Sequence, residues 1–169
     1  MTRNFASTFA LRAGLAFAMT SIGILALAPH ARAQTSTENK AAVQAKFDAW
    51  AAGTGSPFDL LADEASWTIE GNSAASRRYP SKEAFMAEVI RPFNARMAVG
   101  IKPAVRSITA EGDRVVILFD AQGTARDGKP YVNSYAWFFR MKGGRVVEAN
   151  AFYDAIAFNE LWSRVAASE

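Results

Sequence analysis

Cysteine is absent from this sequence of 169 residues, and histidine occurs once, as His30. His30 lies within the signal peptide predicted below, so the mature chain has no Cys–His or Ser–His–Asp nucleophile system, no thiolate redox centre and no zinc site of cysteines or histidines. It also lacks a P-loop, a dinucleotide-binding fingerprint and a G-x-S-x-G elbow. We expect no metal and no cofactor, so any chemistry must use carboxylates, tyrosine, lysine, arginine or amides.

The first 33 residues have the pattern of a secretory signal peptide. Arg3 and Arg12 precede an apolar run over residues 15–28, and the small-residue sequence Ala31-Arg32-Ala33 follows it. The run is shorter than the roughly 20 residues that a membrane-spanning helix needs. We therefore predict cleavage after this sequence and a mature protein that is periplasmic or secreted.

An excess of basic residues is missing once residues 1–33 are removed. The whole chain has 19 Lys and Arg against 16 Asp and Glu, and Arg3, Arg12 and Arg32 lie in the predicted signal, which leaves equal numbers. We therefore expect no nucleic-acid partner, and no membrane association after signal cleavage. The remaining length suits one domain over residues 40–168, after a flexible leader over residues 34–39.

The first part of the mature chain predicts two helices and a strand. Apolar residues recur at helical spacing over residues 40–52, and Gly53 ends this pattern. Ser56 and Pro57 favour the start of a short second helix. Residues 65–70 then alternate in the manner of a strand.

A third helix and a hairpin follow. Ser81 is expected to cap this helix, and Pro92 is expected to kink or split it. The apolar residues on its predicted buried face are Phe85, Val89 and Phe93. Residues 101–109 and 114–122 then predict two strands joined across Glu111-Gly112-Asp113.

Polar side chains are expected to share one face of two neighbouring strands. Asp127-Gly128 suits a type I′ turn, which would join the strand over residues 114–122 to one beginning at Tyr131. With these two residues as the loop, the cross-strand pairs on one face are Gln122 with Asn133, Asp120 with Tyr135, and Leu118 with Trp137. An acid, a phenol and two amides would then stand on an otherwise apolar face.

The last strand has two alternative registers. A two-residue turn at Gly143-Gly144 would place on that face Glu148, Asn150, Phe152 and Asp154. A three-residue turn with Gly144 in a bulge would instead place there Ala149, Ala151 and Tyr153. We favour the second register because it gathers apolar side chains beside the aromatic strand, and a slip of one residue exchanges the faces. Asp154 is also suited to cap a C-terminal helix.

Three segments carry a resemblance to a known family: YAWFFRMKGGRVV from Tyr135, Phe152-Tyr153-Asp154, and Trp67 to Tyr79 with Ser81-Lys-Glu-Ala-Phe85. Over about residues 38–165 the chain resembles the SnoaL-like and ketosteroid-isomerase-like branch of the nuclear-transport-factor-like superfamily. The resemblance implies an α+β fold in which a cone-shaped, curved antiparallel sheet, N-terminal helices and a C-terminal helix surround a deep apolar pocket. It also implies a dimer in many members.

The superfamily includes ketosteroid isomerases, limonene epoxide hydrolases, polyketide cyclases and non-catalytic modules. By resemblance to the epoxide hydrolases, Asp120 matches one carboxylate of an Asp-Arg-Asp set, whereas Leu118 and Ala151 replace the other two members. By resemblance to the ketosteroid isomerases, Ala136 falls near the protonated aspartate, and Ile69 or Glu70 falls near the base. Neither mechanism therefore carries over intact, and fold alone does not fix activity.

Two functions are compatible with these residues. In the first, Asp120 beside Tyr135 is a general acid or base of an isomerase, cyclase or hydrolase that acts on a small apolar substrate. In the second, the pocket binds a small apolar ligand without changing it. The residues expected to line the pocket in either case are Trp50, Leu118, Gln122, Asn133, Trp137, Ala151 and Tyr153.

The strand over residues 114–122 is apolar on both faces, whereas a solvated outer face should be polar. We therefore predict a homodimer that buries Ile117, Phe119 and Phe138 against the partner. A dimeric interaction module without a ligand is the alternative that this surface leaves open.

Overall fold

The computed structural model describes residues 35–167, and the predicted signal peptide lies outside the described residues. The helices are α1 (Ser36–Ala52), the 3₁₀ helix η1 (Pro57–Leu60), α2 (Lys82–Phe85), the π-helix η2 (Met86–Ile90), α3 (Arg91–Asn94) and α4 (Ala155–Arg164). The strands are β1 (Leu61–Ile69), β2 (Arg78–Tyr79), β3 (Met97–Glu111), β4 (Arg114–Ala125), β5 (Pro130–Lys142) and β6 (Arg145–Tyr153). No helix within this range is long and apolar enough to cross a membrane.

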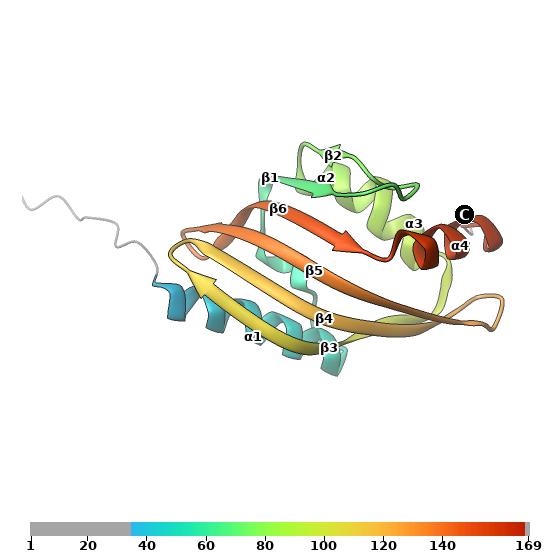
Figure 1. Cartoon of the computed structure of the whole chain (residues 1–169), viewed down its shortest axis with the longest axis horizontal. Coiled ribbons are helices and arrows are strands. Elements are labelled where there is room, and N and C mark those ends of the chain that lie inside the picture. Colours follow the sequence, from blue (N-terminus) through green and yellow to red (C-terminus); the bar gives the residue numbers. More distant parts are fainter. Residues whose placement is uncertain (1–34, 168–169) are drawn as a thin grey trace, which may run out of the picture. The chain divides into compact units, whose positions relative to one another are not determined.

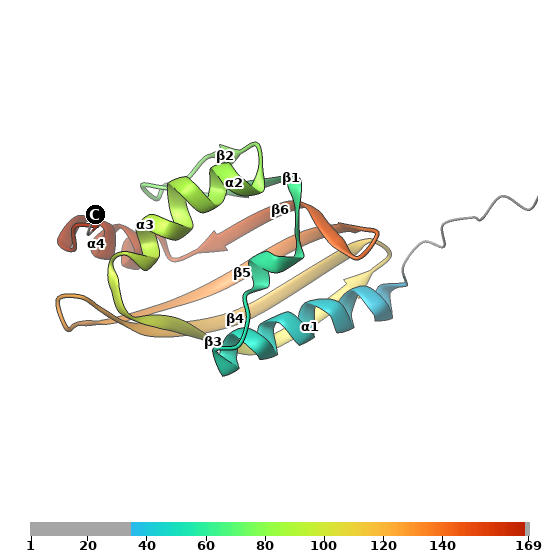
Figure 2. The ribbon, with the colours of Figure 1, turned by 180° about the vertical axis from the view of Figure 1, so that it is seen from behind.

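The strands form one curved, open sheet in the order β2-β1-β6-β5-β4-β3, as Figure 1 shows. Every neighbouring pair is antiparallel except β1 and β6, which run parallel. Figure 2 shows α1, α2 and α3 on the same face of this sheet. The predicted α+β class is confirmed. Within residues 35–167, the helices leave the other face of the sheet without a covering layer.

Helix α1 begins before the predicted position. Thr35 and Glu38 form a capping box, in which Thr35 Oγ1 accepts from the Glu38 amide at 3.2 Å and Glu38 Oε2 accepts from the Thr35 amide at 2.8 Å. Asn39 is buried, and its side-chain amide donates to the Gly112 carbonyl at 3.1 Å. The prediction of a flexible leader over residues 34–39 is therefore wrong from Ser36 onward, because these polar residues cap and anchor the helix.

The predicted third helix is split in the way that Pro92 suggested. Ser81 Oγ accepts from the Ala84 amide at 3.2 Å and caps α2, and η2 then widens the helix by one residue before α3. Proline lacks an amide hydrogen and its ring crowds the preceding turn, so a π turn beside it relieves the conflict. The predicted buried face is confirmed for Phe85, Val89 and Phe93.

The hairpin between β4 and β5 has a different register from the predicted one. Residues 126–129 form the connection, with Gly128 at a φ of 82°, instead of a two-residue turn. The partners of Phe119 and Asp120 are Tyr135 and Ser134. The pairing predicted between Asp120 and Tyr135 is therefore wrong by one residue, which exchanges the two faces of β4.

Burial of apolar surface explains which face of β4 turns inward. The inward residues are Val115, Ile117, Phe119 and Ala121, all of them buried. The alternate residues Val116, Leu118, Asp120 and Gln122 face outward and are half-buried or exposed. The inward set contains no polar side chain, so the observed register buries more apolar area than the predicted one.

The hairpin between β5 and β6 places on the inner face the residues that we predicted there, but its turn has two residues instead of the predicted three. Lys142 pairs with Arg145 across Gly143-Gly144, and both glycines have positive φ, 56° and 77°. A two-residue turn of this kind requires positive φ at both positions. A register shift just beyond it, next to Met141, then restores the favoured pairing. The pairs on the inner face are Phe139 with Ala149, Trp137 with Ala151 and Tyr135 with Tyr153.

The irregular start of β3 passes close to Gly123 of β4. A side-chain carbon at Gly123 would lie 2.6 Å from the Val99 carbonyl oxygen and 2.9 Å from the end of Met97. The register of β3 shifts on both sides of Val99, so the backbone bulges toward β4 at this point. Glycine is therefore required here by close approach and not by a left-handed conformation.

We expect Gly123→Ala to lower the free energy of unfolding by about 1–3 kcal/mol, because the added methyl group forces the backbone of β3 to move. Gly100→Ala is the matched control, since a side-chain carbon there meets nothing within 4 Å. This control should change stability by no more than about 0.5 kcal/mol. Urea unfolding of both variants checks the prediction, and equal stabilities would contradict it.

Candidate ligand-binding pocket

A cavity of about 480 Å³ lies between the helices and the inner face of the sheet. Its volume falls within the range of small-molecule sites in proteins. Nine of its twenty lining residues are aromatic: Trp50, Phe58, Trp67, Phe85, Phe93, Tyr135, Trp137, Tyr153 and Phe158. No acidic or basic side chain of the described residues is among those that line it.

The aromatic wall is held by ring packing from several elements. Trp67 of β1 stacks on Phe85 of α2 with centroids 4.3 Å apart, and it meets the edge of Trp137 on β5 at 5.1 Å. Phe119 of β4 also packs at right angles to Trp137, at 4.8 Å. Each ring thus fixes its neighbour, so the wall is formed before any ligand arrives.

Two irregular segments contribute to the cavity wall. Gly55 and Ser56 come from the loop that precedes η1, and Asn94 and Gly100 come from the end of α3 and the start of β3. Asn94 and Gly100 are exposed, whereas Tyr135 and Trp137 are buried.

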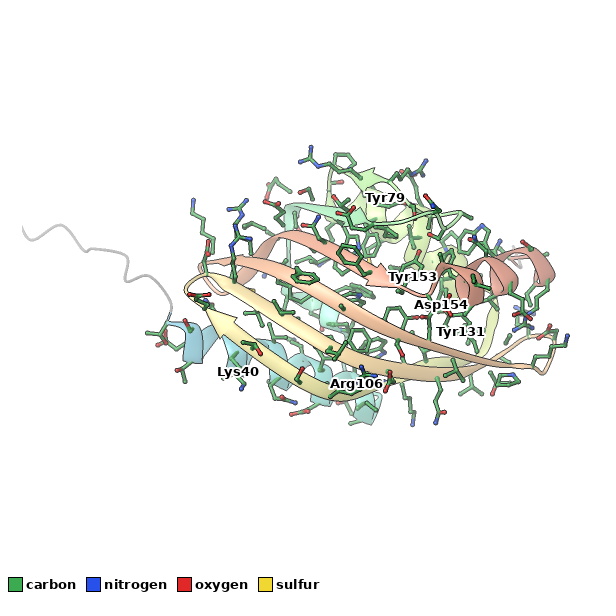
Figure 3. The ribbon with its side chains drawn as sticks, in the orientation of Figure 1. Lys40, Tyr79, Arg106, Tyr131, Tyr153 and Asp154 are labelled. Atoms are coloured by element: carbon green, nitrogen blue, oxygen red, sulfur yellow. The ribbon has the colours of Figure 1, made fainter. Side chains whose placement is uncertain are left out.

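The first chain of hydrogen bonds beside the cavity runs along β5. Asn133 Nδ2 lies 2.9 Å from Tyr131 Oη, and Tyr131 Oη lies 3.1 Å from Tyr135 Oη. Asn133 also contacts the start of α4, where Nδ2 donates to the Asp154 carbonyl at 3.0 Å and Oδ1 accepts from the Asp154 amide at 2.9 Å. Tyr131, Tyr153 and Asp154 are labelled in Figure 3, close to the junction between the strands and α4.

A second polar chain connects β6 to the loop after β1. Tyr153 Oη lies 2.8 Å from Ser73 Oγ, which lies 2.9 Å from Ser76 Oγ. The Ser76 hydroxyl in turn donates to the Glu70 carbonyl at 3.3 Å. The hydroxyl group of Tyr153 is thus anchored to the loop and not to the chain that holds Tyr135.

Burial raises the pKa of all three tyrosines of this region. Desolvation is the largest cause for Tyr131, Tyr135 and Tyr153, and the pKa of Tyr135 rises well above its usual value of 10.0. Hydrogen bonds to Tyr135 and Asn133 oppose the shift at Tyr131, and the bond to Ser73 opposes it at Tyr153. All three hydroxyls are therefore protonated and neutral at physiological pH.

We expect the folded protein to form less tyrosinate at pH 10 than the same protein in denaturant, as measured by near-ultraviolet absorbance. The pKa of each of the chain's four tyrosines is raised by folding. The unfolded chain therefore releases these protons first, and the free energy of unfolding falls as the pH rises above about 10. Tyr135→Phe should remove part of the late-titrating signal. Coincident titrations of the folded and unfolded protein would refute this account.

The structure brings five of the predicted site residues to the cavity. Trp50, Tyr135, Trp137, Ala151 and Tyr153 all line it, from α1 and the neighbouring strands β5 and β6. These residues follow from the helical spacing of α1 and from the favoured register of β6. Their role in ligand binding stays a prediction.

Four other predicted site residues do not line the cavity. Leu118, Asp120 and Gln122 lie on the outer face of β4, because the hairpin register differs from the predicted one. Asp120 Oδ1 accepts there from Ser134 Oγ at 2.6 Å and from Arg106 at 3.2 Å. The side chain of Asn133 is buried among Tyr131 and Asp154, so it acts behind the wall.

The same register overturns part of the predicted dimer surface. Ile117 and Phe119 are fully buried within the chain and cannot meet a partner. Phe138 remains on the outer face, 42% exposed, beside Phe152, which is 48% exposed. Their rings lie 5.8 Å apart at a steep angle.

Several wall residues were not predicted as site residues. Phe58, Phe85, Phe93 and Phe158 lie on helical segments, where spacing identifies a buried face but cannot separate core from cavity wall. Tyr131 and Ser73 act through hydrogen bonds that join distant parts of the chain, and no local pattern marks them. Within residues 35–167, no group of acidic side chains could hold a metal ion.

Residues 43–149 match the family model of the SnoaL-like domain. The chain belongs to this family. The match spans more than half of the sequence and includes residues 43–52 of α1, the strands β1 to β5 and the first part of β6. It confirms the resemblance that the aromatic strand and its neighbours indicated.

Solved structures of SnoaL-like and NTF2-like proteins share this fold. Bal32a, from a soil-derived mobile gene cassette, is 23% identical with a TM-score of 0.61, over 75% of this chain and 98% of its own. An NTF2-like protein from Burkholderia pseudomallei is 19% identical with a TM-score of 0.61, over 73% and 96%. TerC, co-crystallised with polyporic acid, is 18% identical with a TM-score of 0.58, over 73% and 97%. No curated protein sequence matches the chain.

Proposed function

We propose that this SnoaL-like protein binds a small, neutral, aromatic molecule in its cavity. The observation that carries the proposal is a wall of aromatic rings without any charged side chain among the described residues. A charged ligand would lose its hydration there without gaining a counter-charge. Flat apolar ligands gain from ring contacts in such a site. TerC, which has the same fold, was co-crystallised with polyporic acid, and this is consistent with a small-molecule role.

A catalytic role is the second candidate, and one observation favours it. Tyr135 lines the cavity with a neutral hydroxyl group, and such a group can stabilise developing negative charge on a carbonyl oxygen. However, Asp120 lies on the other face of the sheet, so the hypothesis of acid and base catalysis by Asp120 with Tyr135 loses its carboxylate. We therefore favour binding over an isomerase, cyclase or hydrolase.

We further propose that the protein is exported and acts in the periplasm or outside the cell. The arginines and the apolar run of residues 1–33, with the small residues at 31–33, support this location. Helix α1 and its cap begin at Thr35, directly after the proposed cleavage position. Cleavage there would leave the capping box intact.

Native mass spectrometry of the protein purified from its own host tests both proposals. We expect a chain that begins at Gln34 and carries a neutral aromatic ligand. Ala151→Leu should lose this ligand, since Ala151 is buried against the cavity and the larger side chain fills it. Asp120→Asn is the control and should keep the ligand with unchanged affinity.

Three results would speak against this view. Loss of the ligand in Asp120→Asn, with retention in Ala151→Leu, would place the site elsewhere. Conversion of the released ligand by fresh protein would favour the catalytic candidate. A chain that retains residues 1–33 in its own host would contradict export.

We also propose that two copies associate through the outer face of the sheet. The apolar residues there are Val116, Leu118, Phe138 and Phe152, and the ion pairs Arg106–Asp120 and Arg140–Glu148 flank them. Exposed aromatic rings within a polar rim are typical of protein interfaces. This surface replaces the predicted one, which had included Ile117 and Phe119.

We expect Phe138→Glu to convert the dimer into a monomer, because the new carboxylate would be buried at the interface. Ile156→Glu is the control, since Ile156 is 81% exposed on α4 and lies outside the sheet. Light scattering across a concentration series provides the measurement. An unmodified protein that stays monomeric at all concentrations would exclude this assembly.

A further inference from the structure

Two tyrosines lie next to each other in the wall of the cavity. Tyr135 and Tyr153 are cross-strand partners on β5 and β6, with ring centroids 5.8 Å apart, and both line the cavity. A hydroxyl both donates and accepts hydrogen bonds, so its role toward a ligand depends on its other partners. The two chains of hydrogen bonds supply these partners. Within each chain, all the hydroxyl groups donate in the same direction.

The chain behind Tyr135 begins at Asn133. The Asp154 amide can only donate and the Asp154 carbonyl can only accept, so the contacts of Asn133 with both groups fix which side-chain atom is the nitrogen. That nitrogen also donates to Tyr131 Oη. Tyr131 is 2% exposed, and among the described residues Tyr135 provides the sole acceptor for its proton. A buried hydroxyl without an acceptor is costly, so Tyr131 donates to Tyr135.

The hydroxyl proton of Tyr135 therefore has no acceptor among the described residues. Its oxygen accepts from Tyr131, and Tyr135 itself borders the cavity. Its hydroxyl can thus donate to a ligand. Asn133 does not touch the cavity, but it sets this direction through Tyr131, which makes it a positioning residue.

In the hydrogen-bond chain behind Tyr153, the donors point away from the cavity. The Ser76 hydroxyl donates to the Glu70 carbonyl, so its oxygen accepts from Ser73. The hydroxyl proton of Ser73 is thus donated to Ser76. The Ser73 oxygen therefore accepts the hydrogen bond from the Tyr153 hydroxyl. Tyr153 therefore directs its proton away from the cavity and leaves a lone pair for the ligand.

We propose that the cavity wall offers one hydrogen-bond donor, the Tyr135 hydroxyl, beside one acceptor, the Tyr153 hydroxyl. This pair selects ligands that carry a carbonyl oxygen next to an N–H or O–H group. This inference rests on the proposed binding function and names the ligand class for the same site. Lactams, amides and hydroxy-ketones on a flat ring system have this pattern. Because burial raises the pKa of both tyrosines, both roles persist across the physiological pH range.

Four flat probes of similar size test the pattern in the purified protein. Phenanthridin-6(5H)-one has the acceptor and the donor side by side, and its N-methyl derivative retains the acceptor alone. Carbazole has the donor alone, and phenanthrene has neither. Equilibrium dialysis should show the tightest binding for the lactam and the weakest for phenanthrene.

Two matched variants then separate the roles of the hydroxyls. Tyr135→Phe should weaken the lactam and its N-methyl derivative by about fivefold and spare carbazole, because one hydrogen bond is lost. Tyr153→Phe should weaken the lactam and carbazole by about fivefold and spare the N-methyl derivative. Circular dichroism confirms that each variant is folded.

A third variant tests the direction of the chain itself. Ser73→Ala removes the acceptor for the Tyr153 proton, which can then turn into the cavity. We expect carbazole to bind more weakly and the N-methyl lactam more tightly, a reversal that a merely structural role of Ser73 would not produce.

The outcomes distinguish this inference from the function on which it rests. If the unmodified protein binds all four probes equally and the variants show no crossover, the inference is overturned while aromatic binding stands. If none of the probes binds, the proposed function itself fails. The crossover between Tyr135→Phe and Tyr153→Phe supports both.

Discussion

The packing of Phe119 is the constraint on which the site depends. Its ring is fully buried, stacks on Tyr135 with centroids 4.8 Å apart, and meets Phe47 of α1 at 5.0 Å. A slip of one residue between β4 and β5 would expose this ring and bury Asp120 in its place. The cost of burying an unpaired carboxylate adds to the lost apolar burial, so a single register is strongly preferred. This choice keeps Asp120 away from the inner face of the sheet.

The same choice explains why the cavity is neutral. With Asp120 outside, where Ser134 and Arg106 satisfy it, the described residues that line the cavity are uncharged. Behind them, Asn133 is held by two hydrogen bonds to the backbone of Asp154. The two tyrosines at the end of these chains border the cavity, and they are the groups best placed to recognise a ligand.

The side chains of β5 alternate between the two faces of the sheet, and the two faces contribute to different parts of the protein. Tyr131, Asn133, Tyr135, Trp137 and Phe139 point inward and are buried, whereas Val132, Ser134 and Phe138 point outward and are exposed. The inward residues build the wall and its hydrogen bonds, and the outward aromatic rings provide the proposed contact surface. The proposed ligand site and the proposed contact surface thus share one strand.

The sequence by itself determined the order of elements, the α+β class, the split helix at Pro92 and the aromatic strand, because these depend on local periodicity and on the chemistry of proline and glycine. It also indicated the register of β6, since the apolar residues alternate there. The tertiary structure decided the register of β4, because both faces of that strand are apolar and the turn at residues 126–129 has no unique signature. It alone revealed the chains through Asn133 and Ser73, since hydrogen bonds across 21 and 80 positions leave no local pattern.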